Sequence, residues 1–190
     1  MSAVILTCMN YHKITLCGLK RKLPIVRVSK KTRLAQFSLL GDVELVDKLA
    51  DVLAKKLIKI EFDCLVAPEV RVLPLVHGVA LRLKHKRFVV CRKSVSPYMI
   101  EPKILKPLPH FPKHVEQLVV DGRDVGMING RKVVIIDDVV STGVTMRMIK
   151  KMMDDIGAEV VKLVSVVKQG EQFDNFDDLI YLGELPLFKD

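Results

Sequence analysis

The sequence predicts an α/β fold built on a parallel, doubly wound sheet. Apolar runs begin near residues 63, 87, 132 and 160, and the segments between these runs mainly show helical spacing. The run at residues 133–136 contains only valine and isoleucine, which is typical of a strand buried on both faces of a parallel sheet. Buried strands that alternate with helices favour the doubly wound class. A chain of 190 residues can enclose one full core, so we expect a single domain over residues 1–190.

The composition is that of a soluble globular protein, with 49% hydrophobic and 28% charged residues. Lys and Arg outnumber Asp and Glu by 31 to 22, which gives a formal net charge of +9. A basic surface would suit nucleic acid, but it would equally suit a substrate that carries several phosphate groups. Aromatic residues make up only 5% and are not interleaved with basic residues, so we expect no nucleic-acid partner.

The cysteines point to a reducing compartment. They are scattered through the chain without the spacing of metal ligands, and two of them, Cys64 and Cys91, fall in apolar runs where free thiols pack as small hydrophobic groups. No apolar run is long enough to span a bilayer, and we recognise no signal peptide. We therefore expect a cytoplasmic protein with no membrane partner.

The first half of the chain provides scaffold elements. A strand or extended turn is expected at residues 24–29, after a basic run. Helical spacing over residues 42–57 predicts a helix that packs on the sheet, with Asp42 as its N-cap. We assign no chemistry to this helix.

A candidate binding loop follows the buried strand expected at residues 63–67. Residues 68–72, Pro-Glu-Val-Arg-Val, form the turn after this strand. Helical spacing returns at residues 73–83, where Pro74 is tolerated in the first turn. Ligands of open α/β sheets bind beyond the carboxyl ends of the strands, which is where this turn lies.

A long irregular region follows the strand expected at residues 87–93, which ends in Arg92 and Lys93. Residues 94–131 contain five prolines and show no helical period, so they are expected to form a functional lid or a disordered segment. Residues 98–105 and 115–120 could pair as a two-stranded ribbon. His110, His114 and Glu116 also lie here and are expected to be solvated rather than to bind a metal.

The most informative stretch is residues 133–145. Asp137 and Asp138 stand where the buried strand should end, a short Ser-Thr-Gly turn follows, and a helix continues from residue 146 to Gly157. Unpaired backbone N–H groups and the helix dipole make the turn a site for an anion such as phosphate. Carboxylates cannot bind that phosphate, so they require sugar hydroxyls or a divalent cation. The alternative is a structural strand–turn–helix with a solvated acidic pair.

The order of these residues resembles the phosphoribosyl pyrophosphate signature of type I phosphoribosyltransferases. That signature has four apolar residues, two acids, two variable residues, a small residue and then Thr-Gly-x-Thr. The resemblance implies that Asp137 and Asp138 bind the ribose hydroxyls. Val144 stands where many members have a second glycine, so the loop must adopt an ordinary conformation there. The resemblance assigns the 5′-phosphate to a loop, called here the phosphate loop, which consists of Val139, Val140, Ser141, Thr142, Gly143, Val144 and Thr145.

The resemblance extends to the residues expected around the leaving group. The turn at residues 68–72 matches the pyrophosphate loop of the family in its place, with Arg71 as the basic residue and Val72 where the family has glycine. The adenine-type members also end the next strand with an Arg-Lys pair, whose lysine meets the pyrophosphate. The residues assigned to pyrophosphate are therefore Glu69, Val70, Arg71 and Lys93, of which Arg71 and Lys93 join Asp137 and Asp138 as catalytic residues.

The purine is assigned to the N-terminal segment and to the end of a later strand. Residues 1–40 would form a small hood in which Arg27 helps to cover the base, and residues 94–131 would be the flexible catalytic loop. Strands are expected at residues 160–167 and 179–182. Lys168, after the first of these, stands where 6-oxopurine members place a lysine that donates to O6, whereas Ser141 stands where those members carry an aspartate.

The resemblance as a whole implies a purine phosphoribosyltransferase of nucleotide salvage, of the adenine type. It implies Mg2+ bound mainly through the substrate, with Asp137 and Asp138 as possible ligands. We expect phosphoribosyl pyrophosphate and a purine as substrates, and a homodimer. Three alternatives remain open: transfer to a 6-oxopurine, a non-catalytic regulator that senses phosphoribosyl pyrophosphate, and a nucleic-acid-binding protein with a degenerate site.

Overall fold

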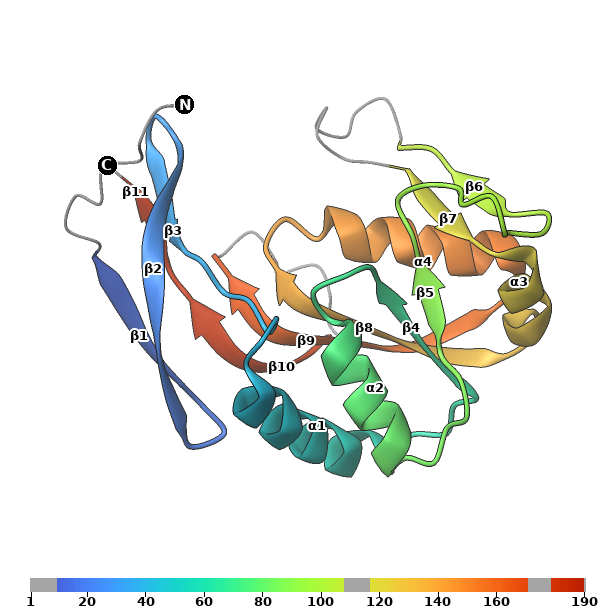
Figure 1. Ribbon diagram of the computed structural model, residues 1–190, viewed down its shortest axis with the longest axis horizontal. Helices are drawn as coiled ribbons and strands as arrows, with labels where there is room; N and C mark the ends of the chain where they lie inside the picture. The colour runs from blue at the N-terminus through green and yellow to red at the C-terminus, as the bar shows by residue number, and fades with distance from the viewer. Residues whose placement is uncertain (1–9, 108–116, 171–178, 190) are drawn as a thin grey trace.

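The computed structural model describes residues 10–107, 117–170 and 179–189. A five-stranded parallel sheet forms its centre, so the predicted fold class is confirmed (Figure 1). Across the sheet the strand order is β10 (Leu179–Leu185), β9 (Glu159–Gln169), β8 (Lys132–Val140), β4 (Cys64–Pro68) and β5 (Val89–Cys91).

Helices cover both faces of this sheet. α1 (Val43–Leu57) and α2 (Leu73–Arg82) pack side by side on one face, and α4 (Val144–Ile156) lies on the other (Figure 1). The buried residues accordingly form two apolar clusters, one on each side of the sheet. β4, β5 and residues 133–136 of β8 are wholly apolar because both of their faces are covered. Within the described part of the chain, no helix has the length and apolarity required to cross a membrane.

The order of the strands defines where a ligand can bind. From β4 the chain proceeds outward to β5, whereas from β8 it proceeds in the opposite direction to β9 and β10. The connections therefore diverge between the neighbouring strands β4 and β8. Such a switch point leaves a crevice at the carboxyl ends of the two strands.

A second, antiparallel sheet is formed by the N-terminal segment and the last strand. Its order is β1 (Tyr11–Leu16), β2 (Leu19–Ser29), β3 (Thr32–Ala35) and β11 (Leu187–Lys189), and we refer to it as the hood sheet. The sequence predicted only the part of β2 near residues 24–29. The hairpin between β1 and β2 turns at Cys17 and Gly18, both with positive φ, and this pair lacks the usual Asn-Gly pattern.

The hood sheet is joined to the rest of the molecule at α1 and at β10, among other places. Arg21 of β2 forms ion pairs with Asp42 at 2.6 Å and with Glu44 at 2.7 Å, at the start of α1. The Asp42 side chain also accepts a hydrogen bond from the Leu45 amide at 3.1 Å, which confirms it as the N-cap. β1 packs closely against β10 because Gly183 has no Cβ: an added Cβ would lie 2.5 Å from Leu16 Cδ2.

The irregular region contains more regular structure than the sequence suggested. β6 (Lys103–Leu105) and β7 (Leu118–Val120) pair as the expected antiparallel ribbon. A short helix, α3 (Gly122–Ile128), was missed; Asp121 caps it by accepting from the Arg123 amide at 3.0 Å. The helix has only seven residues, two of them glycine, which is too little for a periodic pattern. His110, His114 and Glu116 lie outside the described residues.

The two glycines of α3 should respond in opposite ways to replacement by alanine. A Cβ at Gly122 would lie 2.4 Å from the Ile100 carbonyl oxygen, whereas a Cβ at Gly126 would have no neighbour within 4 Å. We expect Gly122→Ala to lower the free energy of unfolding by about 1–3 kcal/mol, because the backbone must shift. Gly126→Ala should raise it by about 0.5–1 kcal/mol. Urea denaturation of both variants tests this, and equal effects would contradict the close approach.

Candidate active site

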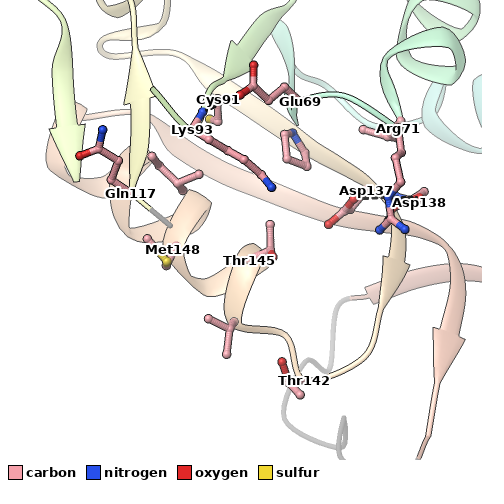
Figure 2. Close-up of a pocket in the computed structure, with 14 residues that line it drawn as sticks. Glu69, Arg71, Cys91, Lys93, Gln117, Asp137, Asp138, Thr142, Thr145 and Met148 are labelled. Carbon is pink, nitrogen blue, oxygen red and sulfur yellow. Dashed lines mark hydrogen bonds and ion pairs between the residues drawn. The ribbon is translucent and has the colours of Figure 1, made fainter. Parts of the chain in front are cut away.

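A cavity of about 340 Å³ lies at the switch point between β4 and β8. Figure 2 shows side chains that border it from the turn after β4, the end of β5, the second half of β8, the loop and helix that follow β8, and Gln117 just before β7. All of these except Gln117 lie toward the carboxyl ends of parallel strands, which the sheet brings to one edge. The cavity is lined by Pro68, Glu69, Arg71, Val72, Cys91, Lys93, Gln117, Leu118, Asp137, Asp138, Thr142, Val144, Thr145 and Met148.

The acidic pair lies inside β8 and not at its end, which corrects the expectation from the sequence. β8 continues to Val140 because it stays paired with β9, but its pairing with β4 stops at Ile135. Beyond that residue β8 borders the crevice. Asp137 is 7% exposed and Asp138 is 1% exposed, so the pair is buried and the alternative of a solvated acidic pair is excluded.

Asp138 is held by contacts that leave one of its oxygens unsatisfied. Its Oδ1 accepts hydrogen bonds from the Val139 amide at 2.9 Å and from Arg71 Nη2 at 3.1 Å. Oδ2 is 3.1 Å from Arg71 Nε, but it is buried and accepts no hydrogen bond from the described residues. A buried carboxylate oxygen without a donor is energetically unfavourable, so this atom is suited to a hydroxyl group or a cation supplied by a ligand.

Asp137 lies in a less favourable electrostatic environment than its neighbour. Its Oδ1 accepts a hydrogen bond from the Asp138 amide at 2.8 Å. Burial raises the pKa of Asp137 to about 8, and the adjacent charge of Asp138 adds to the increase, while Arg71 opposes it. Two carboxylates this close are costly to ionise together, so Asp137 is suited to keep a proton or to accept a hydrogen bond from a bound donor.

The phosphate loop forms a small hollow of about 110 Å³ between the end of β8 and the start of α4. Gly143 adopts φ 71°, a left-handed conformation, immediately before the helix. Val144 is the first residue of α4, so it has the ordinary conformation expected for it. Arg147 Nη2 donates to the Thr142 carbonyl at 2.6 Å. The loop thus presents the first amides of a helix to the hollow, as an anion site requires.

The turn after β4 is fastened to the end of β5 by Glu69. Its Oε1 accepts a hydrogen bond from the Lys93 amide at 2.8 Å, and its Oε2 from Arg92 Nε at 3.3 Å. Val72, in place of the family glycine, has φ −88° and is buried, so the turn needs no glycine there. Figure 2 shows the Lys93 side chain reaching into the cavity toward the side of Asp137. Glu69 therefore fixes the spacing between the turn that carries Arg71 and the end of β5 that carries Lys93.

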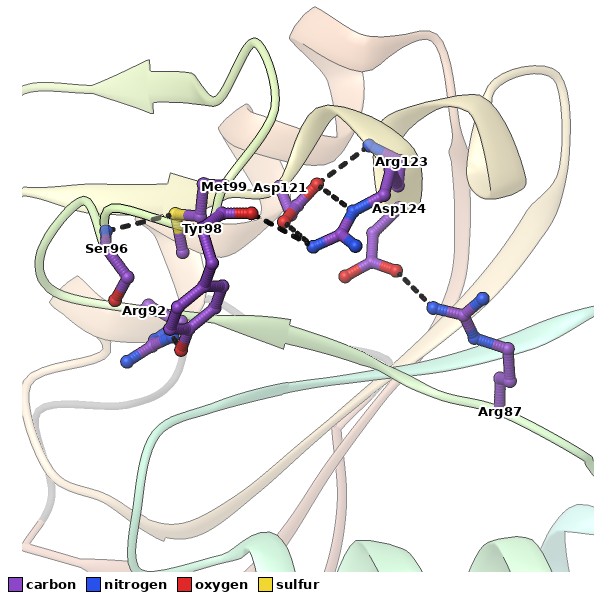
Figure 3. Close-up of polar contacts among 8 residues, drawn as sticks. All are labelled: Arg87, Arg92, Ser96, Tyr98, Met99, Asp121, Arg123 and Asp124. Atoms are coloured by element: carbon purple, nitrogen blue, oxygen red, sulfur yellow. Dashed lines mark hydrogen bonds and ion pairs between the residues drawn. The ribbon is translucent and has the colours of Figure 1, made fainter.

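A network of polar contacts connects Arg92, at the end of β5, with residues of the irregular region on either side of the β6–β7 ribbon (Figure 3). Arg92 lies over the Tyr98 ring, with 5.5 Å from Cζ to the ring centroid, and donates to the Tyr98 hydroxyl. Arg123 pairs with Asp121 at 2.7 Å and donates to the Tyr98 carbonyl at 3.4 Å. The segment that follows Lys93 is thus held at Tyr98, which contacts both Arg92 and Arg123.

Neither of the two residues assigned to the purine, Arg27 and Lys168, lines the cavity. Arg27, on β2, donates to the Lys30 carbonyl at 3.0 Å. Lys168, on β9, lies with Nζ 5.9 Å from the centroid of the Tyr181 ring. Their role toward the purine stays a prediction. Conversely, Gln117, Met148 and Cys91 line the cavity and were not singled out; Met148 follows Val144 by one helical turn, which was the available clue.

The comparisons with known proteins agree with this geometry. A model of the phosphoribosyl transferase domain matches residues 40–183. The adenine phosphoribosyltransferase of Thermosipho africanus is 34% identical over 154 residues, which cover 80% of each protein. The chain belongs to the phosphoribosyltransferase family. This confirms the resemblance seen in the sequence.

Other members of the phosphoribosyltransferase family are more distant. The orotate phosphoribosyltransferase of Archaeoglobus fulgidus is 28% identical over 143 residues, 75% of this chain and 68% of that protein. The crystal structure of adenine phosphoribosyltransferase from Thermoanaerobacter pseudethanolicus superposes with a TM-score of 0.63 at 23% identity, covering 92% of this chain and 95% of that one. The structural likeness supports the fold, and the sequence likeness supports the family.

The raised pKa of Asp137 predicts a pH-dependent stability. Between its ordinary value of 3.8 and about 8, folded Asp137 keeps a proton that the unfolded chain has lost. The free energy of unfolding should therefore decrease as the pH rises through this range. Asp137→Asn, which cannot ionise, should have a higher Tm than the parent protein at pH 8 and a similar Tm near pH 4. The exposed Asp154→Asn serves as control, and a Tm difference for Asp137→Asn that does not change with pH would contradict the prediction.

Proposed function

We propose that this phosphoribosyltransferase transfers the 5-phosphoribosyl group of phosphoribosyl pyrophosphate to a purine, with adenine as its preferred base and AMP and pyrophosphate as products. One observation carries the proposal: the buried acidic pair and the phosphate loop, both parts of the family signature, border the same cavity as Arg71 and Lys93. The 34% identical relative named for adenine supports the choice of base.

The ribose 5-phosphate half of the substrate fits the β8–α4 side of the cavity. Asp137 and Asp138 accept hydrogen bonds from the two ribose hydroxyls, and Asp138 Oδ2 has a vacant acceptor position for one of them. The phosphate lies in the hollow of the phosphate loop, where the amides at the start of α4 and the Thr142 and Thr145 hydroxyls donate to it. The ribose is thus held at both ends.

The pyrophosphate half fits the opposite wall. Arg71 and Lys93 supply positive charge, and Glu69 borders the same space. Val70 belongs to the same turn but does not line the cavity. As the bond from ribose C1 to the pyrophosphate oxygen breaks, the bonding electrons leave with the pyrophosphate, and these cations stabilise the added charge. Purine N9 then forms the new bond to C1, and the proton that it loses passes to the released pyrophosphate or to water. The acidic pair favours the positive charge that develops on the ribose, and positioning supplies much of the rate.

The donors in the cavity are compatible with Mg2+ held chiefly by the substrate. Among the described residues, no group of three or more His, Cys, Asp or Glu side chains gathers to hold an ion. Asp137 and Asp138 provide carboxylate oxygens, of the hard type that Mg2+ prefers, and Mg2+ commonly binds through one or two carboxylates together with substrate phosphates. When bound, the ion would neutralise part of the pyrophosphate charge.

The remaining assignments belong to the same proposal. The hood, residues 1–40 with Arg27, covers the base, and residues 94–131 close over the cavity to exclude water during transfer. The free thiols of Cys64 and Cys91 are buried in the sheet, which suits action in the reducing cytoplasm. We expect the active form to be a homodimer.

The direct test is pyrophosphate release with phosphoribosyl pyrophosphate, Mg2+ and adenine, hypoxanthine, guanine or xanthine in turn. We expect turnover with adenine above the other bases. The double variant Asp137→Asn with Asp138→Asn should lose several orders of magnitude in kcat, because its amides can still accept but carry no negative charge. Circular dichroism checks that the variant is folded. Near-normal turnover by a folded double variant would refute the transferase mechanism, and binding of substrate without turnover by the parent protein would favour a sensor.

Replacing Arg71 or Lys93 should impair the use of phosphoribosyl pyrophosphate but hardly affect the purine. Arg71→Ala and Lys93→Ala should each lower kcat/KM for phosphoribosyl pyrophosphate by roughly 10- to 1000-fold, since each removes a charge-assisted contact of about 1.5–4 kcal/mol. The KM for the purine should change little. Lys55→Ala on α1 is the control for charge alone. A variant that mainly raised the purine KM would place that residue on the base.

Lys168 offers the test of base selection. An ammonium group is a donor only, so Lys168 aimed at the purine six-position would favour a carbonyl and disfavour adenine. The contact with Tyr181 instead keeps Lys168 at the end of β9. We therefore expect Lys168→Ala to leave the ratio of kcat/KM for adenine over hypoxanthine nearly unchanged and above one, with Lys162→Ala as control. A ratio below one that rises in Lys168→Ala would make the chain a 6-oxopurine transferase.

A further inference from the structure

The positive charge of this chain is concentrated in its first 41 residues. They contain eight Lys and Arg and no Asp or Glu, whereas residues 42–190 contain 23 basic and 22 acidic residues. Nearly the whole net charge of +9 therefore belongs to the segment that forms β1, β2 and β3. The net charge of the whole chain conceals this asymmetry, and the expectation of no nucleic-acid partner was based on the aromatic content instead.

The alternation of the β1–β2 hairpin directs three lysines outward. Ile14, Leu16 and Leu23 face inward and are buried in the core cluster, and Arg21 faces inward to its ion pairs with α1. Side chains on successive residues of a strand point to opposite faces. Lys13, Lys20 and Lys22 therefore project from the outer face, and all three are exposed. We call these three residues the lysine face.

The lysine face lacks the counter-charges present elsewhere in the molecule. Lys13 lies directly opposite Lys22 across the two strands. Like charges in such positions destabilise a sheet. Among the described residues none of the three lysines is within 4 Å of a carboxylate, whereas Lys55, Lys150 and Lys151 on the helices each pair with an acid four residues away. The hairpin thus keeps a repulsive arrangement that an external polyanion would relieve.

The geometry points to the phosphate backbone of a nucleic-acid duplex as the partner of the lysine face. Lys20 and Lys22 are two residues apart on one strand, about 7 Å, and Lys13 lies opposite Lys22 on the neighbouring strand, so the three ammonium groups form a compact cluster of point charges. Lysines of this kind contact phosphates without reading bases. Tyr11 on β1 and Val28 on β2 are the large apolar side chains exposed on these two strands, which is too little for insertion into a bilayer. None of the three lysines lines the reaction cavity, so substrate binding does not account for them.

The test is the salt dependence of duplex binding. Fluorescence anisotropy with a labelled 20-base-pair DNA duplex, and an RNA duplex of the same sequence, gives the association constant from 50 to 300 mM salt. Three neutralised phosphates should contribute a slope of about −2.7 to log K against log salt on DNA. The variant Lys13→Gln, Lys20→Gln, Lys22→Gln should lose that contribution. Loss on both duplexes identifies general backbone binding, and loss on one alone identifies that nucleic acid as the partner.

A matched control separates the lysine face from net charge. Lys55→Gln, Lys150→Gln, Lys151→Gln removes the same formal charge from paired lysines and should leave the slope unchanged. Pyrophosphate release by the lysine-face variant should remain normal. The proposal is overturned if the parent protein binds neither duplex at 50 mM salt, or if the control variant weakens binding as much. It is also overturned if the lysine-face variant raises the KM for phosphoribosyl pyrophosphate while binding duplex as the parent does.

A single substitution provides a second readout that does not depend on the triple variant folding. Lys22→Glu places an acid opposite Lys13, so it should raise the Tm by replacing repulsion with attraction. The same substitution should weaken duplex binding. A Lys22→Glu protein with a raised Tm and undiminished duplex affinity would show that the lysine face is not the binding surface.

Discussion

Two carboxylates are buried side by side in β8, and the arrangement of the site depends on how their charge is accommodated. Asp138 pairs with Arg71, which reaches it from the turn after β4, 67 residues earlier in the chain. This ion pair bridges the crevice between the two strands that have ceased to pair. It satisfies Asp138 only in part, since Oδ2 still lacks a hydrogen-bond donor. A ligand hydroxyl that donates to Oδ2 would therefore stabilise the buried pair.

The same ion pair has a consequence for substrate binding. Arg71 neutralises Asp138 in the free protein, yet we assign it to the pyrophosphate of the substrate. Its guanidinium side chain is about half exposed, with 51% of its surface accessible, so it can be shared with a second anion on its open side. Glu69 holds the neighbouring turn by its bonds to the Lys93 amide and Arg92. Glu69 thus fixes the backbone of the turn, while the charged groups of Arg71 and Lys93 remain at the surface of the cavity, where they can contact the substrate.

The sequence predicted best what is local and periodic. The central strand, the N-cap Asp42, the helix stop at Gly157 and the ordinary conformation of Val144 all follow from neighbouring residues, and the structure agrees with each. What it missed depends on distant partners. β8 extends past the acidic pair because β9 continues to pair with it. The hood sheet is completed by β11, from the other end of the chain, which pairs with β3. The seven-residue α3 is held by Asp121 and by contacts at its first turn, which no pattern reveals.

The distribution of charge separates the reaction site from the hood. Near the cavity two of the cations are matched by carboxylates, Arg71 by Asp138 and Arg92 by Glu69. This matching limits the attraction of the cavity for any passing polyanion, so a substrate must make specific contacts to bind there. On the lysine face the charges are unmatched and point away from the core, where they attract a phosphate backbone without selecting a base. One chain can thus present a selective anion site at the cavity and a non-selective one on the lysine face. The two sites differ because carboxylates accompany basic side chains at the cavity but not on the lysine face.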